Sequence, residues 1–105
     1  MSVQIDVTDN SEVHRYEAHT DGALAGFIDY RIRDGRISLI HTQVEDAFEG
    51  KGVVSVLVKR ALGTVRDSRL AMLPVCPFVQ AYLQRHPEYV DLVPEGERAR
   101  FELPG

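Results

Sequence analysis

Alternating apolar and polar positions run through the first 44 residues of the chain and predict strands rather than helices. Two Asp-Gly dipeptides, at residues 21–22 and 34–35, interrupt the alternation, and such a pair supplies the positive φ that a tight hairpin turn needs. The segments around them therefore predict an antiparallel meander. Its strands are expected at residues 12–20, 23–34 and 36–44, preceded by an edge strand at residues 3–7.

The pattern changes to helical spacing after the sequence Gly-Lys-Gly at residues 50–52. Apolar residues then recur every three or four positions from Val53 to about Asp67, which predicts an amphipathic helix whose apolar side covers the sheet. A continuous apolar run at residues 70–75 follows, and it predicts a short buried strand.

Prolines indicate where the elements begin and end in the last quarter of the chain. Pro77 predicts the start of a second helix, because the N–H that proline lacks has no partner in a first helical turn. Pro87 disfavours helical backbone in the residue before it, so this helix is expected to stop at His86. Residues 89–93 are predicted as a last strand, and the polar residues 94–105 as an irregular tail.

Length and charge narrow the class of protein. The 105 residues suit one domain over residues 1–105. A net charge of −4 without a block of Lys or Arg argues against a nucleic-acid partner. No apolar run approaches the roughly 20 residues of a membrane span, and the N-terminus does not resemble a signal peptide, so a cytoplasmic protein without a membrane partner is expected. The histidines show no metal-ligand spacing, and no metal is expected.

The glycines before the first helix are candidates for ligand binding. Gly50 and Gly52 allow a sharp turn, and the N–H groups at the start of a helix have no internal acceptors. This combination suits an anion such as a pyrophosphate. The alternative is a turn with no ligand, since the spacing is not that of a P-loop.

Two longer motifs carry a family resemblance, "HTQVEDAFEGKGVVSVLVKRAL" and "PVCPFVQAYLQRHPEY". With them the chain resembles the small, single-domain branch of the GNAT acyl-CoA-dependent N-acetyltransferases. The resemblance implies an α/β (α+β) fold, with a mixed, mostly antiparallel sheet, helices on its faces and a splayed strand pair. It also implies that acetyl-CoA is the donor and that an amine, either small or on a protein or peptide, is the acceptor.

The resemblance further implies where coenzyme A binds. The pantetheine arm would lie between the strand ending near Val44 and the strand ending near Cys76, and the pyrophosphate would lie at the glycine loop. Glu49 and Val54 replace residue types usual in the family, which keeps two alternatives open: a non-catalytic acyl-CoA-binding module and an interaction domain that retains the fold. The implied coenzyme-binding residues are Thr42, Gln43, Val44, Glu49, Gly50, Lys51, Gly52, Val53, Val54 and Phe78.

Three residues are candidates for the chemistry. Cys76 precedes a helix N-terminus, which favours a thiolate that could carry the acyl group, although a lone cysteine is also a common buried apolar residue. His41 is predicted on the same strand face as Ile37 and Leu39; it could deprotonate the amine, or it could equally be a hydrogen-bonded histidine on a partly apolar face. Tyr82 could protonate the leaving thiolate, or it could simply pack on the sheet.

Overall fold

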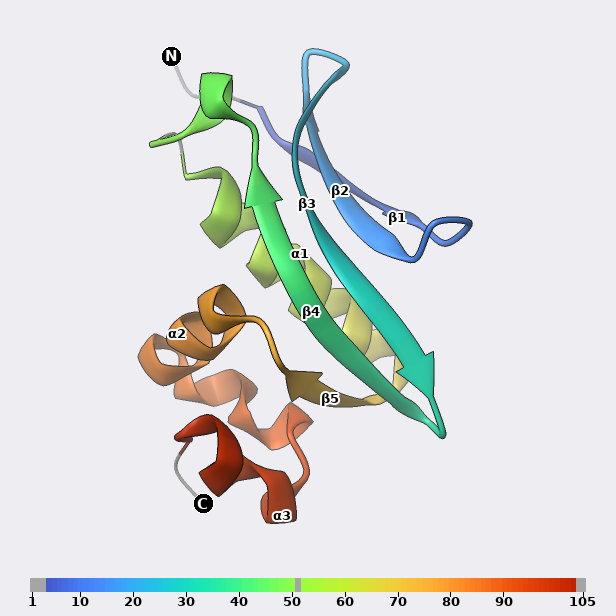
Figure 1. Ribbon diagram of the computed structural model, residues 1–105, viewed down its shortest axis with the longest axis vertical. Coiled ribbons are helices and arrows are strands. Elements are labelled where there is room, and N and C mark those ends of the chain that lie inside the picture. Colours follow the sequence, from blue (N-terminus) through green and yellow to red (C-terminus); the bar gives the residue numbers. More distant parts are fainter. Residues whose placement is uncertain (1–3, 51, 104–105) are drawn as a thin grey trace.

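In the computed structural model, which describes residues 4–50 and 52–103, the chain forms a five-stranded sheet with its helices packed against it (Figure 1). The strands lie in the order β1-β2-β3-β4-β5; β1 to β4 are antiparallel neighbours, and β5 is parallel to β4. The predicted mixed, mostly antiparallel sheet is therefore confirmed. The elements are β1 (Asp6–Asn10), β2 (Arg15–Thr20), β3 (Ala23–Arg33), β4 (Arg36–Val44), η1 (Asp46–Phe48), α1 (Val53–Ser68), β5 (Ala71–Pro74), α2 (Pro77–Arg85), η2 (Pro87–Leu92), α3 (Glu95–Arg98) and η3 (Ala99–Phe101).

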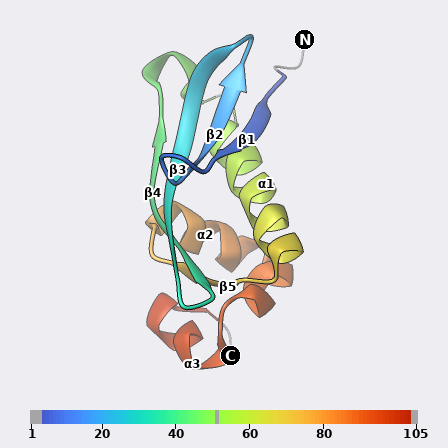
Figure 2. The same ribbon diagram turned by 90° about the vertical axis from the view of Figure 1, so that its right-hand side faces the viewer.

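The core lies between the sheet and α1. The apolar side of α1, including Leu57, Ala61 and Leu62, is fully buried against Ile28 and Leu39 of the sheet, as the helical spacing predicts. Helix α2 contacts both α1 and β5. Figure 2 shows the sheet edge-on, with α1 on one side and, among the described residues, no helix over the other side. We call this the uncovered face.

Both Asp-Gly turns form as predicted. The four residues Asp21, Gly22, Asp34 and Gly35 have positive φ between 51° and 80°, as a two-residue hairpin turn requires. The first two strands begin later than predicted. Strand β1 starts at Asp6, three residues later than expected, and His14 belongs to the β1–β2 turn with a φ of 55°.

The last quarter of the chain overturns two predictions. Residues 89–93 are not a strand, because η2 spans Pro87–Leu92 and the bidentate pair between Arg66 and Asp91 ties it to α1 (2.9 Å for each bond). The tail is not irregular either: α3 and η3 follow, and Phe101 and Leu103 are buried in the core. Tertiary contact, which the local pattern does not show, gives these short segments their structure.

Gly26 marks the closest approach in the sheet, and we expect Gly26→Ala to lower the free energy of unfolding by about 1–3 kcal/mol. A Cβ there would lie 2.7 Å from the carbonyl oxygen of Gln43, a main-chain atom that cannot move away without displacing β4. Chemical denaturation would measure the loss.

Gly63, within α1, gives the matched control. A Cβ at Gly63 meets nothing within 4 Å, so Gly63→Ala should stabilise the helix by about 0.5–1 kcal/mol. If Gly26→Ala were as stable as the wild type or more so, the close approach at Gly26 would not matter.

Candidate functional site

Strands β4 and β5 separate halfway along β4. Their parallel pairing runs from Arg36 with Ala71 to Leu39 with Pro74, and the N–H of Cys76 makes a last bond to the carbonyl of Leu39 (2.8 Å). Strand β4 then continues to Val44 beside β3, while the chain after β5 turns away into α2 (Figure 1). The predicted splay is confirmed, and within the described part of the chain it leaves the last five residues of β4 without a partner strand on this side.

A bulge in β4 overturns the prediction for His41. Asp29 pairs with His41 and Tyr30 with Leu39, so Ile40 is an extra residue on β4. Beyond it the faces exchange: His41 is exposed on the uncovered face beside Phe27, with ring centroids 6.2 Å apart. His41 therefore lies on the face opposite Leu39, not on the same face.

The bulge also turns Thr42 into the buried side of the sheet. Leu39 directs its carbonyl toward β5, whereas the N–H of Glu45 bonds back to Ala25 of β3 (2.8 Å). Main-chain N–H and C=O groups alternate in direction along a strand. Since the N–H of Glu45 points to β3, the main-chain groups of Val44 and Thr42 point to the open edge. The groups of Gln43 point to β3, so only two of the three residues predicted to pair with a ligand are free to do so.

The glycine loop ends at the first turn of α1. Gly50 and Gly52 have φ of 77° and 75°, and Gly52 is the N-cap of the helix without any side-chain capping bond. The first amides of α1 have no acceptor within the helix, so they are available to an oxygen ligand. Lys51 lies outside the described residues.

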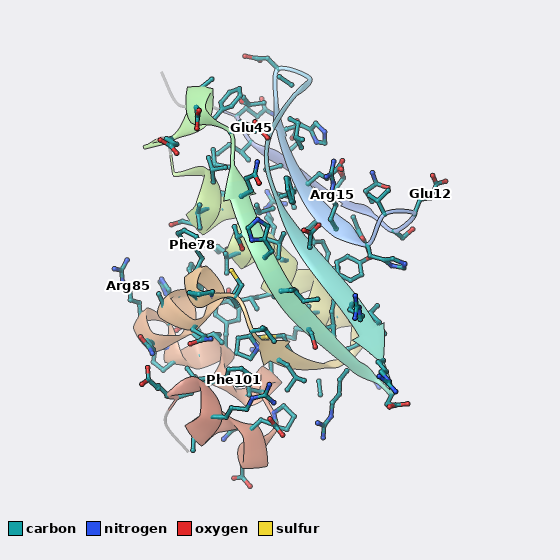
Figure 3. All side chains as sticks on the ribbon, in the orientation of Figure 1. Glu12, Arg15, Glu45, Phe78, Arg85 and Phe101 are labelled. Carbon is teal, nitrogen blue, oxygen red and sulfur yellow. The ribbon has the colours of Figure 1, made fainter. Side chains whose placement is uncertain are left out.

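A cavity of about 340 Å³ joins the open edge of β4 to the start of α1. All its lining residues except Phe48 and Ser55 belong to the predicted coenzyme-binding set, and Gln43 of that set does not line it. Phe78, at the start of α2, is 55% exposed and lies below the first turn of α1 (Figure 3). The lining residues are Thr42, Val44, Phe48, Glu49, Gly50, Gly52, Val53, Val54, Ser55 and Phe78.

Sequence reasoning missed two of these residues for different reasons. Phe48 is the one large apolar side chain in the acidic stretch before the glycines, and this was a usable signal. Ser55 is the third residue of α1, and its place follows only from where the helix starts. Glu49 is the charged residue among the described lining positions, so main-chain dipoles carry most of the attraction for an anion.

Cys76 is buried, with 1% of its surface exposed, and it is the N-cap of α2. Its carbonyl accepts the N–H groups of Val79 and Gln80, and its Sγ lies 3.1 Å from Oγ1 of Thr42. Thr42 lines the cavity and Cys76 does not. The thiol is thus one side chain removed from the cavity wall.

Tyr82 is not brought to the cavity. Its ring stacks on His86 at 4.2 Å and lies 6.1 Å from Tyr89. Burial raises the pKa of its hydroxyl, and the nearby Tyr89 and Glu88 raise it further. The hydroxyl therefore stays protonated at neutral pH, but its role as a proton donor stays a prediction.

Within residues 4–50 and 52–103, no group of three or more His, Cys, Asp or Glu side chains is arranged to hold a metal ion. Within the same ranges, none of the helices has both the length and the apolar character needed to cross a membrane.

Comparison with known proteins gives the family context of this site. A family model described as GCN5-related N-acetyltransferase matches residues 15–92. Protein NATD1 of Xenopus tropicalis and that of Homo sapiens are each 35% identical to the chain over 51 residues, 49% of its length. The match covers 47% and 45% of those two proteins, so the chain aligns with less than half of either relative.

A solved structure shares the fold. The NMR structure of a GCN5-like candidate N-acetyltransferase from Staphylococcus aureus superposes with a TM-score of 0.62 and covers 89% of both chains. Its sequence identity to this chain is 23%, so the likeness concerns the fold alone.

Proposed function

Because the chain belongs to the GCN5-related N-acetyltransferase family, we propose that it moves an acetyl group from acetyl-CoA to an amine. One observation carries the proposal: among the described residues, one cavity connects main-chain groups of β4 that have no partner strand with amides of α1 that have no acceptor within the helix. Acetyl-CoA has amides along its pantetheine arm and phosphates at its other end. The two sets of groups in the cavity match these two parts in kind and in order.

Each part of the donor has a candidate partner. The pyrophosphate would accept hydrogen bonds from the first amides of α1, favoured by the positive end of the helix dipole. The main-chain groups of Thr42 and Val44 would pair with the pantetheine amides, as a neighbouring strand would. Phe78 would pack on the apolar part of the arm. The thioester would then lie where β4 and β5 meet, near Leu39.

The acceptor amine would approach that point from the uncovered face. Its nitrogen attacks the thioester carbonyl, the C–S bond breaks, and coenzyme A leaves as a thiolate that takes up a proton. The amine must lose a proton to attack, and imidazole titrates close to neutral pH. His41 is the imidazole that the bulge places on this face, and we assign it this proton.

Thermal unfolding with ligands tests the proposed function. At a free concentration 100 times its Kd, acetyl-CoA is expected to stabilise the protein by about 2.7 kcal/mol, and ATP much less. Adding amines should then release free coenzyme A. Stabilisation without release across a broad set of amines would instead indicate a binding module. Absence of stabilisation would favour an interaction domain.

Cys76→Ser separates direct transfer from transfer through the thiol. We expect direct transfer, because Cys76 is only 1% exposed and its Sγ is in contact with Oγ1 of Thr42 (3.1 Å). Mass spectrometry after mixing with acetyl-CoA alone should therefore show no acetyl group on Cys76, and Cys76→Ser should keep its turnover within about tenfold of the wild type. An adduct on Cys76, lost together with activity in Cys76→Ser, would establish the covalent route.

A further inference from the structure

We infer that a second cavity, on the uncovered face, binds an anionic group of the acceptor, so that the preferred substrates are small amines bearing a carboxylate or a phosphate. This inference rests on the proposed acetyl transfer. The arginine pocket, as we call it, has a volume of about 440 Å³ and is lined by Arg31, Arg33, Asp34, Arg36, Ser38 and Leu73.

The register of the β3–β4 hairpin gathers the three guanidinium groups of the pocket. Arg33 is directly opposite Arg36, and Arg31 is opposite Ser38, so all of these side chains lie on the same face of the sheet. Two like charges directly opposite each other destabilise a strand pair. A chain with a net charge of −4 thus places three positive charges together at one end of its sheet.

Few acidic side chains form ion pairs with the arginines of this pocket. Among the described residues, Arg33 forms an ion pair with Asp34 at 3.8 Å. Both side chains are largely exposed, by 86% and 89%, so solvent weakens this pair. Arg31 and Arg36 are exposed, and within residues 4–50 and 52–103 neither has an ion pair. Planar guanidinium groups without acid partners suit a carboxylate or phosphate, which they can bind in a bidentate manner.

The position of the pocket connects it to the acceptor rather than to the donor. Ser38 and Leu73 form the strand pair next to Leu39 and Pro74, after which β4 and β5 separate. At about 3.3 Å per residue, Ser38 is one step from the proposed thioester position, whereas Val44 and the phosphate end of the cavity are roughly 17 Å away in the opposite direction. An amine held at the separation point could therefore reach the arginines with an anionic group a few bonds away.

Acetylation rates with matched amines test the inference. We compare β-alanine and phosphoethanolamine with the uncharged propylamine and ethanolamine. The wild type should favour the anionic amines at least tenfold in kcat/KM, mainly through KM. Arg31→Gln with Arg36→Gln should remove the preference and leave rates with neutral amines unchanged. The double Lys variant should retain part of it.

Arg85→Gln, at an exposed position of α2, is the matched control and should change nothing. Equal rates for neutral and anionic amines in the wild type would overturn the inference, as would a preference that survives in the double Gln variant. A larger effect of β-alanine than of phosphoethanolamine identifies the carboxylate as the ligand, and the reverse identifies the phosphate.

A readout that needs no turnover separates this inference from the proposed function. NMR titration with phosphoethanolamine should shift the amide signals of Arg31, Arg36 and Ser38 in the wild type but not in the double Gln variant. Such binding without acetylation of any amine would overturn the proposed function and leave an anion site. Acetylation of neutral amines without such binding would overturn the inference alone.

Discussion

Ser55→Glu is expected to weaken the binding of coenzyme A about 100-fold, which corresponds to roughly 2.7 kcal/mol, without loss of stability. Ser55 is exposed, lines the cavity and is the third residue of α1. A carboxylate there would compete with phosphate oxygens for the first amides of the helix and would repel them. The same charge suits the helix itself, because the first turn of α1 has no acidic residue and acids are favourable there.

Two comparisons make this result specific. Ser55→Gln, with nearly the same shape and no charge, should bind coenzyme A far better than Ser55→Glu. Acetyl-pantetheine, which has no pyrophosphate, should bind both variants alike. Isothermal titration calorimetry measures each affinity. An unchanged Kd for coenzyme A in Ser55→Glu would mean that the phosphates are not held at the start of α1.

Phe101→Ala is expected to lower the free energy of unfolding by about 3–5 kcal/mol, and the melting temperature by roughly 10–20 °C. Phe101 is 4% exposed and belongs to the core cluster, although it follows the polar sequence of the tail (Figure 3). Domains of this size unfold with only about 5–15 kcal/mol, so the loss would be a large share of the stability.

Phe78→Ala removes the same atoms from a side chain that is 55% exposed. It should leave the melting temperature of the free protein nearly unchanged and weaken acetyl-CoA binding, because Phe78 lines the cavity. Thermal unfolding of the two variants, with and without acetyl-CoA, tests both expectations. If Phe101→Ala proved as stable as the wild type, the C-terminal segment would not be part of the core.

The strands and the helix that surround the cavity could be predicted from the sequence, because the residue patterns that define them are local. Asp-Gly turns, strand alternation and the change to helical spacing after Gly52 define β3, β4 and α1 almost residue by residue, whereas β2 begins three residues later than predicted. The glycine motif around Gly50 lines a cavity, as local sequence signals allow one to anticipate, because main-chain direction follows from the elements themselves. That these residues bind coenzyme A stays a prediction.

The arrangement around His41 could not be predicted in this way. A bulge adds one residue to a strand, and Ile40 and His41 are both acceptable on either face, so the alternation of residue types gives no sign of it. The prediction of an irregular tail at residues 94–105 failed for a related reason. Phe101 and Leu103 flank the charged Glu102 and follow a mostly charged stretch, and only their membership of the core cluster shows that they are buried.

The separation of β4 from β5 also changes the number of edges in the sheet. Strands β1 and β5 are its outer strands, but the second half of β4 is a third edge in the middle of the sheet. Unpaired main-chain groups of this kind can recruit a strand from another molecule. The exposed stretch is short, and it ends in the acidic residues Glu45 and Asp46, which oppose such strand addition by charge. The acidic residues after the C-terminal end of β4 thus oppose aggregation at this open edge.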